Sequence, residues 1–201
     1  MFFEFVPLDS VGEAFPDAVP AWEVEEGRTY ALLISAPNGL WRYAIGDTVR
    51  IESADPLRIR IAGRTRSFIN AFGEELMVHN ADSAIARAAE LTGAQVLNYT
   101  AAPVFAADDR RGCHQWLIEW AREPQSMEAF AEALDTTLQQ LNSDYQAKRS
   151  GTIFLDPPML TTAAPGLFDR WLASTGKLGG QRKVPRLSND RAIIDRMLAM
   201  Q

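Results

Sequence analysis

Hydrophobic and polar positions alternate with a period of two in the first third of the chain. Residues 57–61 read Leu-Arg-Ile-Arg-Ile, which places three aliphatic side chains on one face of an extended segment. Apolar runs also cover residues 2–6, 29–35 and 40–45, and a Pro-Asn-Gly turn at residues 37–39 separates the last two. Short strands joined by turns predict a small barrel or a twisted antiparallel sheet.

The apolar spacing lengthens to three and four residues further along the chain. A helix capped by Ser126 is predicted from a stripe formed by Met127, Phe130, Leu134, Leu138, Leu141 and Tyr145. A second helix is predicted between a cap at Asn80 and a stop at Gly93, with an inward stripe formed by Ala81, Ala84, Ile85, Ala88 and Leu91.

Strands are predicted between and after these helices. Residues 114–120 place two tryptophans and an isoleucine on one face, and residues 152–155 form a further short run. A last helix is predicted from about Asp190. This alternation indicates a compact α+β domain after the β-rich start, with a boundary near Gly63-Arg64.

Composition and charge restrict the classes of partner. The 201 residues carry a formal net charge of −6, so general binding to nucleic acid or to a membrane surface is not expected. No apolar run approaches the ~18 residues of a membrane helix, and the first five residues lack the basic start of a signal peptide. A single cysteine, Cys113, excludes an internal disulfide and favours a reducing, cytoplasmic setting.

The first candidate site lies in residues 41–47, Trp-Arg-Tyr-Ala-Ile-Gly-Asp, where a strand is predicted to end in a Gly-Asp turn. An aspartate in a turn commonly bonds its own backbone, so a simple hairpin explains the string. Alternatively, the Asp47 carboxylate accepts hydrogen bonds from paired sugar hydroxyls, as acidic residues do on the ribose of nucleotides.

The second candidate segment, residues 63–75, follows the alternating strand and carries two arginines before another glycine turn. It is either a surface hairpin with a solvated basic edge or a hinge whose Arg64 reaches a phosphate or ribose.

The third candidate segment, residues 178–186, joins two adjacent glycines to three basic residues but lacks the spacing of a phosphate-binding P-loop. It is either a solvated loop or a mobile loop that delivers the Lys183 ammonium to a phosphate oxygen.

The neighbours Cys113 and His114 do not predict a catalytic dyad, because adjacent side chains of a strand point to opposite faces. His79 is predicted to be a loop or helix-start residue. With two histidines and one cysteine in the chain, no transition-metal site is predicted.

Taken together, the order of these segments resembles the second half of an adenylate-forming enzyme. The strings FFEFVPLD, LWRYAIGDTVRI, AGRTRSFINAFGEEL and GGQRKVPRLSNDR resemble the Gretchen Hagen (auxin-responsive promoter) family of acyl-acid-amido synthetases, in its bacterial branch. The resemblance implies a β-rich tail of the large adenylation domain over residues 1–63. It also implies a small, mobile C-terminal domain over residues 64–201, an α/β sandwich with a mixed sheet flanked by helices.

The resemblance also implies a reaction. The family forms an acyl-adenylate and pyrophosphate from a carboxylic acid and ATP, with Mg²⁺ accompanying the ATP, and an amine or amino acid then displaces AMP to give an amide. Asp47 is expected to bind the ribose hydroxyls, Tyr43 to shape the nucleotide pocket, and Arg64 to contact the nucleotide near the hinge. Lys183 is expected to approach the reacting carboxylate and α-phosphate.

Two departures from the family pattern affect the expected activity. The phosphate loop and most of the acid-binding pocket of the family lie before the string FFEFVPLD, so the chain is expected not to adenylate an acid by itself. Glu75 stands near a position where plant relatives often have lysine, and no role is carried over to it.

Two other functions remain open. The chain is alternatively a non-catalytic binding or oligomerisation module that retains inherited motifs. If Phe2, Phe3 and Phe5 form a bare apolar face, self-association is expected; a monomer without such a face favours the free-standing module. Binding to nucleic acid through the basic residues of 177–196 is less consistent with the sequence, because no aromatic stacking pattern accompanies them.

Overall fold

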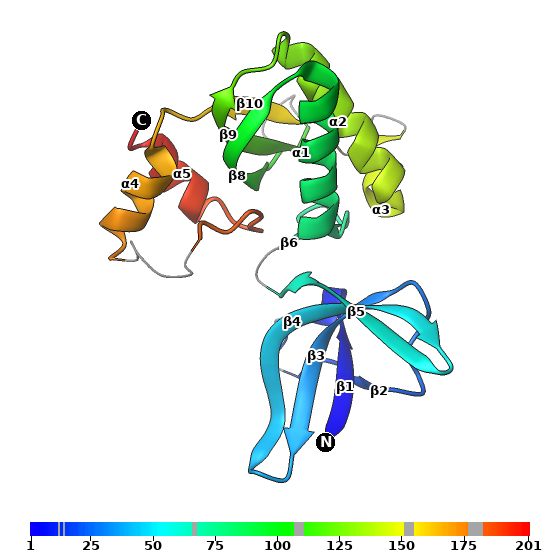
Figure 1. Cartoon of the computed structure of the whole chain (residues 1–201). Helices are drawn as coiled ribbons and strands as arrows, with labels where there is room; N and C mark the ends of the chain where they lie inside the picture. The colour runs from blue at the N-terminus through cyan, green and yellow to red at the C-terminus, as the bar shows by residue number, and fades with distance from the viewer. Residues whose placement is uncertain (12, 14, 66–67, 107–110, 151–154, 177–182) are drawn as a thin grey trace. The chain divides into compact units, whose positions relative to one another are not determined.

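The computed structural model describes residues 1–11, 13, 15–65, 68–106, 111–150, 155–176 and 183–201. It divides the chain into two units, Met1–Arg66 and Ser67–Gln201, and each has its own core. Figure 1 shows the β-rich first unit in blue to cyan and the mixed second unit in green to red.

The first unit is a five-stranded antiparallel sheet in the order β2-β1-β3-β4-β5. A short 3₁₀ turn, η1 (Leu8–Ser10), follows its first strand. The strands are β1 (Phe2–Pro7), β2 (Val19–Pro20), β3 (Thr29–Ala36), β4 (Leu40–Ala54) and β5 (Leu57–Arg64). Of the two predicted arrangements, a small barrel or a twisted antiparallel sheet, the antiparallel sheet is therefore confirmed. Its core is formed by Phe5, Val24, Tyr30, Leu32, Val49 and Ile51.

Strand β4 corrects the expectation that a strand ends in a turn at Gly46-Asp47. The strand continues to Ala54, and its ladder with β3 is interrupted by a bulge. Between the paired residues 44 and 48 of β4, three residues face the single β3 residue Leu32. Gly46 has a φ of +82°, which glycine adopts without steric cost, so the chain absorbs the extra residues and resumes pairing.

The second unit contains a three-stranded mixed sheet in the order β10-β9-β8, a two-stranded sheet β6-β7, and five helices in its described part. Strands β8 and β9 are antiparallel, whereas β10 runs parallel to β9. Its strands are β6 (Phe68–Ile69), β7 (Leu76–Met77), β8 (Gln95–Val104), β9 (Cys113–Arg122) and β10 (Met159–Thr162). Its helices are α1 (Val78–Thr92), α2 (Met127–Leu141), α3 (Ser143–Arg149), α4 (Leu167–Ser174) and α5 (Ala192–Leu198).

Both faces of the mixed sheet are covered by helices. Trp116 and Ile118 of β9 pack with residues of α1 and α2 in one cluster, whereas Leu117 packs with residues of α4 and α5 in another. In Figure 1, α1 and α2 flank one side of this sheet and α4 and α5 the other. The predicted α+β class, with a mixed sheet between helices, is confirmed.

The first helix of the second unit begins earlier than predicted. Asn80 is not the cap but the third residue of α1, and its side chain accepts a hydrogen bond from the Met77 N–H at 3.2 Å. The helix ends at Gly93, as predicted, with a left-handed φ of +68°. Leu91, expected on the inward stripe, is 57% exposed because it lies in the last turn, beyond the packed part of the helix.

The helix capped by Ser126 is confirmed, since the Ser126 hydroxyl accepts a hydrogen bond from the Ala129 N–H at 3.1 Å. The predicted single stripe is nevertheless divided between two helices. Asn142 has an extended backbone, ends α2 and caps α3 by accepting from the Tyr145 N–H at 2.8 Å. Tyr145 is therefore buried from a separate helix.

Strands β8 and β10 and helix α4 of the second unit were not predicted. Of the strand predicted at residues 152–155, the first three lie outside the described residues, and Leu155 forms a single bridge with Gly112. Among the helices of the described part, none is long and apolar enough to cross a membrane.

Candidate functional site

Asp47 lies in the bulge of β4 rather than in a terminal turn. Asp47 lies between Ala44 and Thr48, the residues at which β4 pairs with β3 on either side of the bulge. Bulges often re-aim side chains next to functional sites. Asp47 is half-buried, and the next residue, Thr48, is fully buried with no hydrogen-bond partner for its Oγ1 in the described part. Asp47 is thus part of a strand rather than of a loop.

Two further candidates lie on the same sheet. Arg64 ends β5 and is the direct backbone partner of Asp47 across the β4–β5 ladder. Tyr43 lies on β4 opposite Ile34 of β3, and the residue is 52% exposed, so it is accessible to a ligand. The structure therefore brings Asp47 and Arg64 together in register, although they are 17 residues apart in the sequence.

Lys183 belongs to the second unit and is the first described residue after residues 177–182. The two glycines expected to make its loop flexible lie outside the described residues. The Lys183 side chain is exposed, and within the described part of the chain it has no hydrogen-bond or ion-pair partner. A compact cation without a partner is available to bind an anion.

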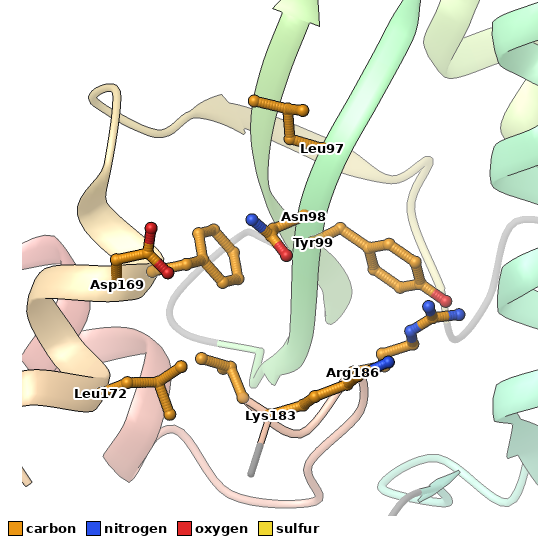
Figure 2. A pocket seen from close by; sticks show the side chains of 9 residues that line it. Leu97, Asn98, Tyr99, Asp169, Leu172, Lys183 and Arg186 are labelled. Atoms are coloured by element: carbon orange, nitrogen blue, oxygen red, sulfur yellow. The ribbon is translucent and has the colours of Figure 1, made fainter. Parts of the chain in front are cut away.

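Lys183 contributes to a cavity of about 320 Å³ between β8, α4 and the segment at residues 183–186 (Figure 2). On α4 the wall combines the apolar Phe168 and Leu172 with the carboxylate of Asp169, and the segment at residues 183–186 adds the apolar Val184 and two basic side chains. Strand β8 contributes Leu97, Asn98 and Tyr99 to the lining. A cavity of this size and mixed lining accommodates a small molecule or part of a larger one.

The sequence analysis missed a buried acid–base pair in the second unit. The Glu74 and His114 side chains are both fully buried, and His114 Nε2 lies 2.8 Å from Glu74 Oε1. The other Glu74 oxygen accepts the Phe72 N–H at 2.6 Å. The pair ties the turn between β6 and β7 to β9. Forty residues separate the partners, and the only signal in the sequence was that His114 shares a strand face with Trp116.

Cys113 does not form a dyad with His114: Nε2 of the histidine bonds Glu74, and its Nδ1 has no hydrogen-bond partner among the described residues. Burial, assisted by Asp156, raises the pKa of the Cys113 thiol, which disfavours the nucleophilic thiolate. Within the described residues, no three His, Cys, Asp or Glu side chains gather into a metal-binding group.

Comparison with known protein families identifies both units. Residues 1–64 match the GH3 family central domain, and residues 79–192 match the GH3 family C-terminal domain.

Curated relatives agree with these matches. The indole-3-acetic acid-amido synthetase GH3.8 of Oryza sativa subsp. indica is 29% identical over 204 residues, which cover 92% of this chain and 33% of the relative. The indole-3-acetic acid-amido synthetase GH3.3 of Arabidopsis thaliana is 25% identical over 200 residues, with the same two coverages. The chain thus spans about a third of the length of these relatives.

Solved structures share the fold. A GH3.15 acyl acid amido synthetase superimposes with a TM-score of 0.69 at 18% identity, over 98% of this chain and 36% of that one. A second structure, AtGH3.15 acyl acid amido synthetase in complex with 2,4-DB, gives a TM-score of 0.64 at the same identity and coverage. Because the family matches extend over most of both units, this chain belongs to the GH3 family.

Proposed function

We propose that this chain is the C-terminal part of an ATP-dependent acyl-acid-amido synthetase, from the bacterial branch of the family and active in the cytoplasm. The observation that carries the proposal is the register of Asp47 beside Arg64 on a bulged strand, in a chain of the GH3 family that also presents an unpartnered Lys183. The substrates are a small carboxylic acid and an amine or amino acid. The acid attacks the α-phosphate of ATP and releases pyrophosphate, and the amine then displaces AMP.

The first unit supplies nucleotide contacts in this proposal. The Asp47 carboxylate accepts hydrogen bonds from the two ribose hydroxyls, a role that suits an acid held at a fixed position on a sheet. Arg64 is its register partner and contacts the nucleotide from the neighbouring strand. The exposed ring of Tyr43 forms part of the nucleotide pocket.

The second unit supplies the mobile cation. As the carboxylate oxygen meets the α-phosphate, negative charge concentrates between them, and a positioned ammonium stabilises that charge. Lys183 suits this task because its ammonium has no competing partner within the described part of the chain. In the proposal, residues 1–63 are the tail of the large adenylation domain and residues 64–201 the mobile small domain. Rotation about the segment that joins them brings Lys183 to the nucleotide and removes it again.

Mg²⁺ enters the proposal only as the companion of ATP. The described residues contain no group of three His, Cys, Asp or Glu side chains that would hold the ion by itself. Magnesium is commonly bound by one or two carboxylates together with substrate phosphates, and we assign no ligand to it in this chain.

Exchange of labelled pyrophosphate into ATP tests the proposal. We expect acid-dependent exchange by the full-length protein that the gene encodes. We expect none by the 201-residue chain alone. Asp47→Asn should raise the KM for ATP about 10-fold, since it removes a charge-assisted hydrogen bond. The matched control is Glu52→Gln, which breaks an exposed ion pair with Arg60 on the same strand pair and should change nothing. Absence of exchange with every acid in a broad panel would refute the proposal.

The alternative, a non-catalytic module, predicts a unit without exposed large apolar side chains. Phe2 and Phe3 are exposed, as expected for a surface that packs against further protein, whereas Phe5 is buried in the core and corrects the expectation for that residue. The exposed residues support a part of a larger enzyme, and they also favour self-association of the isolated chain. Sedimentation of the chain at micromolar concentration distinguishes the two, because a strict monomer would favour the module.

A further inference from the structure

The segment that follows Lys183 is fastened to the free edge of β8. The Ala101 N–H donates to the Arg186 carbonyl at 2.8 Å, and the Ser188 N–H donates to the Ala101 carbonyl at 3.0 Å. One residue earlier on β8, the Thr100 hydroxyl donates to the Pro185 carbonyl at 2.8 Å. The backbone on both sides of Arg186 therefore behaves as a short additional partner of the strand.

The Arg186 side chain is fastened as well. Its Nη1 donates to Asp82 Oδ1 on α1, and the Tyr99 hydroxyl of β8 donates to the same oxygen at 2.5 Å. The guanidinium also lies over the Tyr99 ring, 5.3 Å from its centroid. Figure 2 shows the tyrosine hydroxyl and the guanidinium meeting at one end of the cavity. Burial, together with Asp82, raises the pKa of Tyr99, so its hydroxyl remains a donor.

Lys183 and Arg186, the two cations of this segment, therefore differ in their contacts. Arg186 is held by the Asp82 carboxylate, the Tyr99 ring and a backbone hydrogen bond from Ala101 of β8. Lys183, in contrast, has no partner among the described residues.

The connection between the two cations is short and stiff. Only Val184 and Pro185 lie between them; the valine is buried against the α4–α5 cluster, and the proline ring fixes its own φ. A displacement of Arg186 is therefore transmitted to the backbone of Lys183 rather than absorbed by a flexible linker.

We propose that Asp82, Tyr99 and Arg186 form a clamp that positions Lys183. They are positioning residues, which act through Lys183 and touch no reacting atom. The clamp rests on the proposed function, in which the Lys183 ammonium contacts the reacting groups.

Hydrogen exchange tests the clamp independently of activity. Asp82→Asn removes the charge shared by Arg186 and Tyr99, and we expect exchange of the Ser188 and Ala101 amides to accelerate about 10-fold or more. Tyr99→Phe, which keeps the ring and removes one donor, should have a smaller effect in the same direction. The matched control is Glu90→Gln, which breaks an exposed ion pair with Arg87 elsewhere on α1 and should leave both amides unchanged. Unchanged exchange in Asp82→Asn overturns the clamp.

Kinetics tests positioning in the protein as its gene encodes it. Asp82→Asn and Arg186→Gln should lower kcat for acid-dependent pyrophosphate exchange about 10-fold while the KM for ATP stays the same. Arg186→Lys, which retains a cation for Asp82, should recover part of the loss. If Asp82→Asn accelerates amide exchange but keeps the wild-type kcat, the positioning role is overturned, whereas the proposed function stands. A wild-type protein without pyrophosphate exchange refutes the proposed function and the positioning role together.

Discussion

The two units differ in how far they bury their tryptophans. Trp22 and Trp41 of the first unit are 75% and 82% exposed, whereas Trp116 and Trp171 of the second are buried. The second unit buries apolar clusters on both faces of its mixed sheet, because helices cover each face. The described part of the first unit has a single cluster.

The outer strand β5 illustrates why the first unit leaves large apolar side chains exposed. On β5, Ile59 and Ile61 pair directly with the core residues Ile51 and Val49 of β4, and directly opposed residues share a face. Yet Ile61 is 73% exposed, because β5 is the outer strand and the core cluster does not extend over it. The second unit therefore covers both faces of its sheet, whereas the first leaves part of its core face exposed.

The largest expected effect comes from emptying the small core of the first unit. Phe5→Ala should destabilise that unit by about 3–5 kcal/mol, because Phe5 is buried and its ring packs edge-on against Tyr30. Phe15→Ala, at a position 92% exposed, should cost less than about 0.5 kcal/mol. Denaturant titration followed through backbone amide signals assigned to each unit measures both values. Equal loss of the second unit's signals in Phe5→Ala would contradict separate cores.

A slightly smaller effect is expected in the second unit. Leu138→Ala should cost about 2–5 kcal/mol, since the side chain is fully buried between α2 and the mixed sheet. Leu91→Ala on α1 removes the same atoms from an exposed position and should be nearly neutral. Tryptophan fluorescence reports this transition, because the buried tryptophans lie in this unit. Similar midpoints for the two variants would be inconsistent with the observed packing.

The smallest effect concerns reactivity rather than stability. Because burial raises the pKa of Cys113, less of its thiol is ionised at neutral pH than in an ordinary cysteine. Labelling by a thiol-specific reagent at pH 7 should be slower than for a short unfolded peptide of the same sequence. The rate should rise with pH to a midpoint above that of the peptide. Equal rates at pH 7 would show that the thiol is not held in its neutral form.

The sequence predicted local elements well where periodicity and caps agree. Ser126 and Gly93 mark helix ends by their own chemistry, and the alternation at residues 57–61 predicted the edge strand. Strand β10 was missed because its four residues directly follow two prolines. The contacts that fix it are remote in sequence, since its two threonine hydroxyls accept from Gln115 and Trp120. Helix α4 was missed because it begins directly after a Pro-Gly pair that reads as a loop.

The candidate site was predictable only in part. The motifs named Asp47, Arg64 and Lys183, but the bulge that carries Asp47 depends on pairing with β3, which no local pattern reveals. The partners of Arg186 are likewise remote, since Asp82 lies 104 residues away on α1. Contacts of this kind depend on the tertiary arrangement and become visible only in the structure.

The central claim is that Lys183 is the acting cation of an acyl-adenylate-forming enzyme. The most direct test is the rate of acid-dependent pyrophosphate exchange by the protein as its gene encodes it, in wild type and in Lys183→Ala. Arg196→Ala, an exposed cation of α5, serves as the control. We expect a loss of about 100-fold in Lys183→Ala, corresponding to about 3 kcal/mol of transition-state stabilisation, with unchanged unfolding and a wild-type rate in the control. An unchanged rate in Lys183→Ala would contradict the account.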